Sequence, residues 1–200
     1  QGAATIAPMK SITLRLGKER SLQRRHPWVF EGSVASGKAD PGETVRVQAS
    51  EGAFLAWASY SPSSMIRLRA WSFVEAERID AAFFARRIDR ALTVRARLPI
   101  ASDGLRLIHG EADGLPGLIV DRYAGTLSAQ FLSIGAERWK ATIADHLLKA
   151  TGLTRLYERS DSNVRTLEGL QPVSGWLRGA GETQLTITEQ QAFARTRIEQ

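Results

Sequence analysis

The sequence contains no cysteine and no long apolar run. Without cysteine, disulfide bonds, zinc–thiolate sites and cysteine nucleophiles are excluded, and a reducing cytoplasm is a compatible location. No apolar stretch approaches the roughly 20 residues that span a bilayer, and no basic segment followed by an apolar one opens the chain. We therefore expect a soluble cytoplasmic protein that has no membrane partner.

Glycine-rich nucleotide-binding loops are also missing. No GxxxxGK[ST] occurs, and no GxGxxG follows an expected strand. Gly175, Gly179 and Gly181 are scattered through a segment that reads as irregular and form no such loop. We therefore expect neither a cofactor nor a metal ion in this chain.

What the sequence does have is ordinary globular composition with a basic excess. Its 200 residues are 43% hydrophobic and 24% charged, which is enough for one or two cores, and two small domains are favoured. The 27 lysines and arginines exceed the 21 acidic residues, giving a net charge of +6. This excess favours a polyanionic partner. Residues 1–8 are small and neutral, and we exclude them from the fold.

The first expected domain covers residues 9–73 and is mostly β. Alternating or strand-prone patterns predict strands at residues 12–16, 28–30, 43–48, 54–60 and 66–71, with a hairpin between the third and fourth. Residues 17–25 read as a short basic helix that ends before Pro27. The second expected domain covers residues 74–200 and opens with a helix at 79–98, capped by Asp80.

The rest of the second domain predicts an antiparallel sheet with a helix. Strands are expected at residues 105–109, 118–121, 126–132 and 153–158, a helix at 136–151, and a last hairpin at 185–188 and 193–198. The fold class is therefore α+β. Because the last strand runs into the terminus without a cap or polar tail, we expect a longer parent protein.

The densest basic cluster lies near the start of the chain. It comprises Arg15, Lys18, Arg20, Arg24 and Arg25, followed at once by His26 and Trp28. Cations bind phosphates and exposed aromatic rings stack on unpaired bases, so the cluster predicts an RNA-binding surface. Arg67 and Arg69 alternate along one strand and are expected to extend it. The alternative is a solvated helix face with Trp28 and Phe30 in the core.

Two other groups of residues are weaker candidates for chemistry. His109, Glu111, Asp113 and Asp121 surround a turn-rich connection and suit a metal or acid–base site, although Asp-Gly and Pro-Gly serve a tight turn regardless of function. In the Arg159-Ser160-Asp161 segment, Asp161 is either catalytic or a cap for the following turn, with Arg165 as an alternative partner. We favour the structural interpretation of both groups.

Several motifs resemble, in order, the bacterial large-subunit rRNA cytosine-C5 methyltransferases of the ribosomal large-subunit methyltransferase I type. The matching segments are RRHPWVF (24–30), ASYSP (58–62), IRLRAW (66–71), EADGLPG (111–117) with DR (121–122), and ERSD (158–161) followed by VR (164–165) and EGL (168–170). The resemblance covers residues 9–200.

The resemblance implies an N-terminal PUA domain for RNA binding, a central α+β domain and a C-terminal Rossmann-like domain that binds S-adenosylmethionine (SAM). Only the first two fit within 200 residues. Methylation at C5 of cytosine normally needs a thiolate, and this chain has no cysteine. We therefore expect an RNA-recognition portion that docks structured ribosomal RNA and is inactive alone. The alternatives are a dimerisation or scaffold module, in which a homodimer would form, and a small self-contained hydrolase.

Overall fold

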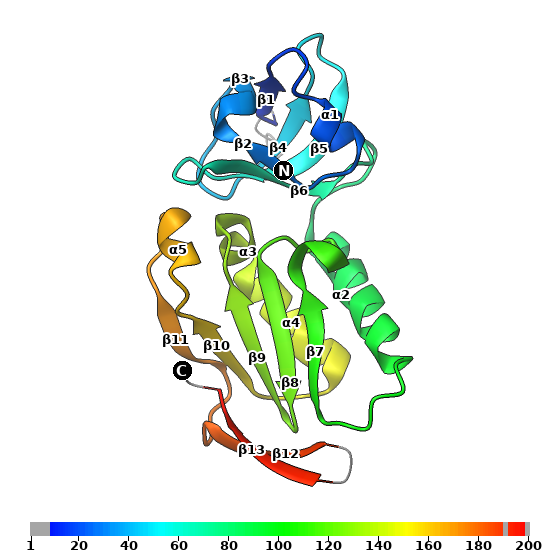
Figure 1. Ribbon diagram of the computed structural model, residues 1–200, viewed down its shortest axis with the longest axis vertical. Helices are drawn as coiled ribbons and strands as arrows, with labels where there is room; N and C mark the ends of the chain where they lie inside the picture. The colour runs from blue at the N-terminus through cyan, green and yellow to red at the C-terminus, as the bar shows by residue number, and fades with distance from the viewer. Residues whose placement is uncertain (1–8, 190–191, 199–200) are drawn as a thin grey trace, which may run out of the picture. The chain divides into compact units, whose positions relative to one another are not determined.

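The computed structural model describes residues 9–189 and 192–198, so the segment 1–8 that we excluded lies outside the described residues. The chain divides into two compact units between Glu77 and Arg78, and each is described by itself (Figure 1). Unit 1 thus ends at Glu77, four residues after residue 73, where we expected the first domain to end. None of the described helices combines the length and the apolarity that a bilayer span requires.

Unit 1 is a six-stranded mixed sheet in the order β2-β6-β5-β4-β1-β3. The strands are β1 (Ser11–Leu14), β2 (Trp28–Phe30), β3 (Val34–Ser36), β4 (Thr44–Gln48), β5 (Phe54–Tyr60) and β6 (Ile66–Ser72), with helix α1 (Arg20–Gln23) and the 3-10 turn η1 (Glu31–Ser33). β1 and β4 are parallel, and the other neighbours are antiparallel. The curled sheet resembles half of a barrel (Figure 1).

The core of unit 1 follows the period-two pattern of its strands. Ile12 and Leu14 on β1, and Val45 and Val47 on β4, are fully buried. Alternate side chains of a strand point to the same face, so these residues line the concave interior of the sheet. Leu22 of α1 is 2% exposed and anchors the helix to the same core. The expected mostly β architecture is confirmed.

Three details of unit 1 differ from expectation. β1 ends at Leu14, two residues before the expected end. The amide of Arg15 bonds to the carbonyl of Ser33, and Leu16 is 82% exposed, so it does not continue the buried face of the strand. The helix is one turn only, since the chain enters the left-handed region at Arg25, with φ 62°. β3 was not predicted, because three residues beside glycine carry too little pattern.

Unit 2 contains a five-stranded sheet in the order β11-β10-β9-β8-β7 and a separate hairpin. The strands are β7 (Gly104–His109), β8 (Leu118–Tyr123), β9 (Thr126–Phe131), β10 (Leu156–Ser160) and β11 (Val173–Arg178), and the hairpin is β12 (Gln184–Glu189) with β13 (Ala192–Arg197). The helices are α2 (Ala81–Ala96), α3 (Ile134–Arg138), α4 (Lys140–Thr151) and α5 (Val164–Leu167), with a 3-10 turn η2 (Gly110–Asp113). The α+β class is confirmed.

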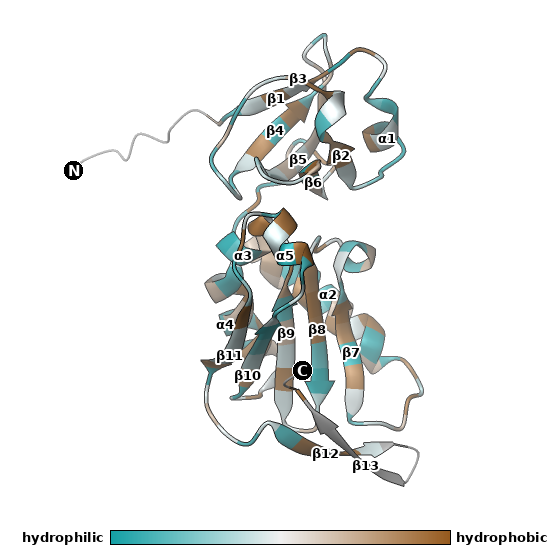
Figure 2. Ribbon diagram, turned by 60° about the vertical axis from the view of Figure 1, so that its left-hand side comes forward, coloured by the Kyte–Doolittle hydropathy of each residue, from teal (hydrophilic) through white to brown (hydrophobic). Residues whose placement is uncertain are grey.

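The expected antiparallel meander β7-β8-β9 is present, whereas β10 runs parallel to β9. A parallel neighbour needs a crossover, and α3 and α4 supply it. Figure 2 shows apolar residues along β7 and β8 within the sheet, and Ile108 and Val120 are fully buried there. β11 was not predicted, because its central Gly175 reads as part of an irregular segment.

Helix α2 begins at Ala81, two residues after the predicted start, and Asp80 caps it as expected. The side chain of Asp80 accepts a hydrogen bond from the amide of Phe83 at 3.0 Å, which satisfies one of the free amides of the first turn. Phe84 is fully buried, with its ring 4.7 Å from that of Trp139 and 5.2 Å from that of Phe83. The expected helix at 136–151 is instead two helices that meet at Trp139. This aromatic cluster joins α2 to that junction.

A buried network of charges lies where α3, α4, β10 and α5 meet. Arg165 is 2% exposed, pairs with Glu137 at 2.8 Å and donates to the carbonyls of Phe131 and Gln171. Lys140 pairs with Glu137 at 2.6 Å and with the buried Glu158 at 2.7 Å. Buried charges are tolerated when each has a partner of opposite charge, and each charge of this network has one.

The network corrects the expectations for the segment 159–161. Asn163, not Asp161, precedes α5, and no side chain caps it. The partner of Arg165 is Glu137, so the expected pairing with Asp161 is wrong. Asp161 is exposed, whereas Ser160 is buried and its hydroxyl accepts from the amide of Phe131 at 2.9 Å. Nothing in these contacts assigns the segment a catalytic role.

Glu137 is expected to make the stability of unit 2 depend on acid. Burial alone would raise the pKa of Glu137, but hydrogen bonds from Lys140 and Arg165 outweigh it, so the pKa lies below its ordinary value. A depressed folded-state pKa stabilises the fold above the unfolded pKa, and this contribution is lost as pH falls through the folded value. Urea unfolding between about pH 5 and about pH 3 should therefore show a weaker acid dependence in Glu137→Gln. An unchanged dependence would contradict this assignment.

Candidate nucleic-acid interface

The basic cluster comprises Arg15, Lys18, Arg20, Arg24 and Arg25, and all five side chains are exposed. Arg20 and Arg24 lie four residues apart, joined by a backbone hydrogen bond of 3.1 Å, so they share one face of α1. Leu22 is buried on the opposite side, which directs that face toward solvent. Within the described residues, none of the five cations forms an ion pair. They therefore remain available for an external anion.

His26 and Trp28 continue the cluster as the sequence predicted, but neither is simply a core residue or a free stacking platform. His26 is exposed, and its Nδ1 accepts from the amide of Trp28 at 3.2 Å. Its ring meets the Trp28 ring edge-on at 5.8 Å. Phe30 is 49% exposed, so it does not belong to the core as the alternative interpretation required.

The two arginines of β6 do not occupy equivalent positions. Arg67 pairs with Glu31 at 2.6 Å and donates to the carbonyls of Ser61 and Pro62. Arg69 is only 7% exposed and lies over the ring of Trp28, 5.6 Å from its centroid. The sequence expectation that both extend an exposed surface is therefore wrong for Arg69. Trp28 on the paired strand β2 covers this position.

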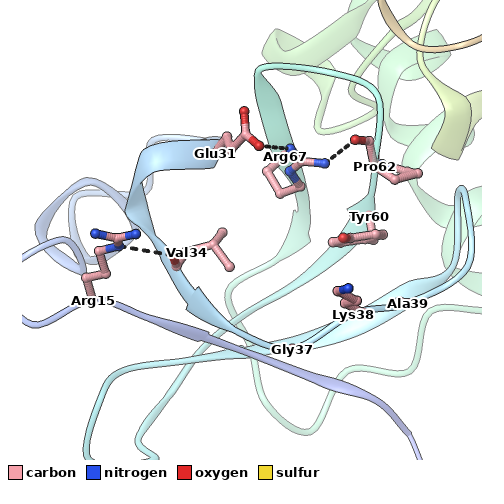
Figure 3. Close-up of a pocket in the computed structure, with 9 residues that line it drawn as sticks. All are labelled: Arg15, Glu31, Val34, Gly37, Lys38, Ala39, Tyr60, Pro62 and Arg67. Atoms are coloured by element: carbon pink, nitrogen blue, oxygen red, sulfur yellow. Dashed lines mark hydrogen bonds and ion pairs between the residues drawn. The ribbon is translucent and has the colours of Figure 1, made fainter.

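A pocket of about 590 Å³ lies beside Arg15 and Arg67 within unit 1 (Figure 3). Its lining residues come from the end of β1, from η1, β3 and the loop after β3, and from β5, β6 and the loop between them. They are Arg15, Glu31, Val34, Gly37, Lys38, Ala39, Tyr60, Pro62 and Arg67. The structure thus brings together Arg15 and Arg67, two members of the predicted RNA-binding set. Lys18, Arg20, Arg24 and Arg25 do not line this pocket.

Backbone geometry shapes the pocket wall at Gly37. Its φ of +105° favours glycine, and a Cβ there would lie 2.4 Å from the carbonyl oxygen of Ser11. Glycine thus lets the loop after β3 pass close to β1 and places Lys38 at the wall. Lys38 is exposed and forms no ion pair within the described residues.

Three pocket residues escaped the sequence analysis. Glu31, Lys38 and Tyr60 lie in separate segments, and none forms a recognisable motif with Arg15 or Arg67. Tyr60 ends a mostly apolar strand, so the sequence alone indicates a core residue. The one local signal was Lys38 directly after Gly37 in a loop, which is a weak indication of a binding residue. Only the folded sheet reveals the group.

The alternative site around His109 and Asp113 is resolved as structural contacts. Asp113 forms a two-pronged pair with Arg95, at 2.7 Å for each contact, and accepts from the amide of His109. Asp121 is paired with Arg106 at 2.8 Å. Within the described residues, no three acidic or histidine side chains gather to hold a metal ion, and that includes Glu111. These carboxylates fasten β7, β8 and α2.

The comparisons with known proteins agree with this arrangement. Residues 12–73 match the family described as a PUA-like domain. Ribosomal RNA large subunit methyltransferase I of Shewanella frigidimarina is 49% identical over 174 residues, covering 84% of this chain and 44% of the relative. The protein of that name from Erwinia tasmaniensis is 46% identical over 183 residues, covering 89% and 46%. The chain therefore spans a little under half of the length of these curated relatives.

Solved structures show the same fold at low sequence identity. A Streptococcus mutans protein assigned as a SAM-dependent methyltransferase superposes with a TM-score of 0.79 at 16% identity, over 96% of this chain and 49% of that one. A methyltransferase structure complexed with SAH gives 0.79 at 15% identity, with the same coverage. The chain is therefore a homologue of proteins named ribosomal RNA large subunit methyltransferase I over about half of their length, as its motifs predicted, and it carries a PUA-like domain.

Proposed function

We propose that unit 1 binds ribosomal RNA and that this binding is the chain's contribution to an rRNA methyltransferase. The observation that carries the proposal is the basic cluster, in which five exposed cations occupy one short segment and form no ion pair within the described residues. Such cations bind phosphates and release counterions from the nucleic acid, which favours association. The PUA-like match over residues 12–73 and the names of the relatives support RNA as the polyanion.

The reaction itself is proposed for the whole protein. The motif resemblance points to C5 of cytosine as the methylated atom and to SAM as the methyl donor. A thiolate nucleophile for that chemistry is not among these 200 residues, since they contain no cysteine. What the chain supplies is a docking surface for structured rRNA. The proposed setting is the cytoplasm, where ribosomal RNA is available to such an enzyme.

Charge reversal at Arg24 and Arg25 tests the proposal. We expect Arg24→Glu with Arg25→Glu to weaken binding of a structured rRNA fragment about 10- to 100-fold at low salt, and to lower the salt slope by about two. Fluorescence anisotropy at several salt concentrations measures both quantities. Circular dichroism checks that the fold is kept.

The matched control reverses two exposed cations of unit 2, Arg90 and Lys149, so that the change in net charge is the same. The control is expected to weaken binding much less than the α1 variant. Equal losses in the two double variants would show that only net charge matters and would refute the proposed surface.

A further inference from the structure

We propose that the pocket of unit 1 holds one unpaired nucleotide of the bound RNA, an inference that rests on the proposed RNA binding. The pocket measures about 590 Å³, within the range of about 300–1,000 Å³ that is typical of small-molecule sites. A concave site of this size admits a nucleotide that has left its stack, but not a base pair within a helix. RNA-binding proteins commonly read such unstacked bases.

The cations of the pocket suit the phosphate of that nucleotide. Arg15 uses its Nε to donate to the carbonyl of Val34 at 3.1 Å, which fixes the guanidinium and leaves its terminal nitrogens free to donate (Figure 3). Lys38 stands on the opposite wall without an ion-pair partner in the described part of the chain. A phosphate between them would meet two positive groups that no carboxylate neutralises.

Tyr60 adds a polar group that the fold itself does not use. The residue is only 7% exposed, and its hydroxyl forms no hydrogen bond within residues 9–189 and 192–198. Figure 3 shows the hydroxyl oxygen directed into the pocket. The ring is packed in the core of unit 1, and the hydroxyl can bond to a ligand without breaking a hydrogen bond of the fold. It is therefore positioned to bond to the base or the sugar.

Glu31 supplies a hydrogen-bond acceptor at the rim of the pocket, and Arg67 supplies a donor. The two side chains form an ion pair of 2.6 Å, in which the Glu31 side chain is 66% exposed and that of Arg67 is 11% exposed. The Arg67 guanidinium also lies 6.0 Å from the centroid of the Tyr60 ring. The carboxylate can accept from the amino group of a base, and the guanidinium can donate to a base carbonyl. The pocket thus offers partners for phosphate and base together.

The test compares a short single-stranded RNA of mixed sequence with the blunt duplex of the same sequence, by fluorescence anisotropy with the full 200-residue chain. Tyr60→Phe removes only the hydroxyl, and Lys38→Ala removes only a cation from an exposed site. We expect each variant to weaken single-strand binding about three- to tenfold and to leave duplex binding unchanged. Lys38→Ala should also lower the salt slope by about one.

The matched controls in unit 2 are Tyr123→Phe and Lys149→Ala. We expect them to leave the affinities for both the single-stranded and the duplex RNA unchanged. As a second readout, single-stranded RNA containing 4-thiouridine is irradiated on the unaltered protein, and adducts are located by mass spectrometry. Adducts on the peptides that carry Tyr60 or Lys38 support the pocket.

The outcomes separate this inference from the proposed function. If Arg24→Glu with Arg25→Glu weakens both RNAs while the two pocket variants bind the single strand normally, RNA binding stands and the nucleotide pocket is refuted. Adducts confined to peptides of the basic cluster would refute it too. If neither RNA binds the unaltered chain in a salt-dependent manner, both proposals fail.

Discussion

Replacing Arg165 by methionine is expected to lower the free energy of unfolding of unit 2 by about 3–5 kcal/mol. The substitution preserves much of the side-chain volume but leaves Glu137 without one of its two cations, and the carbonyls of Phe131 and Gln171 without their donor. Because the guanidinium is 2% exposed, water cannot take its place without opening the structure. The loss therefore exceeds that of a surface pair.

Hydrogen exchange of the β9 and β10 amides in urea measures this loss within unit 2. The matched control is Arg178→Met, which breaks a pair of 2.9 Å with Asp145 whose side chains are 36% and 66% exposed. Exposed pairs contribute less than about 1 kcal/mol, so the control should change little. If both variants destabilise unit 2 equally, the buried network has no special structural role.

Truncation of Phe84 to alanine should cost about 3–5 kcal/mol in unit 2. The ring is fully buried and contacts both Phe83 and Trp139, so its removal leaves a cavity between α2 and the junction of α3 and α4. Neighbouring aromatic rings are large and stiff, which limits how far the cavity can collapse.

Calorimetry of Phe84→Ala beside Phe30→Ala provides the comparison, because Phe30 is 49% exposed and its loss should change stability by about 0.5 kcal/mol or less. A small effect of Phe84→Ala would mean that α2 relaxes onto α4. In that case the aromatic cluster is not what holds the helix in place.

The strands of unit 1 were predictable where burial alternates. Residues 43–48 were expected as a strand and form β4 (Thr44–Gln48), because its buried residues Val45 and Val47 recur with period two. Arg69 was misplaced by the same rule. Alternation assigns it to an open face, but Trp28 on the paired strand β2 covers that position. The sequence pattern shows which side chains of one strand share a face. Whether a side chain on that face is buried depends on the residues of the neighbouring strand.

The basic cluster was predictable because its members lie within eleven residues of one another, and the exposure of Arg20 and Arg24 follows from the buried anchor Leu22 of α1. The pocket was not, since Glu31, Lys38 and Tyr60 meet only through the pairing of strands distant in the chain. Likewise, the partner of Arg165 lies 28 residues away at Glu137, which local spacing does not reveal. Contacts between distant segments are set by tertiary packing, and a single sequence carries little record of them.

Arg25 adopts a left-handed backbone conformation, with φ 62°. For a residue with a side chain this conformation costs about 1–2 kcal/mol, and glycine would avoid most of that cost. An arginine at this position therefore makes the turn after α1 less stable than a glycine would. The stability of this turn and the RNA contact that we propose for Arg25 therefore favour different residues at this one position.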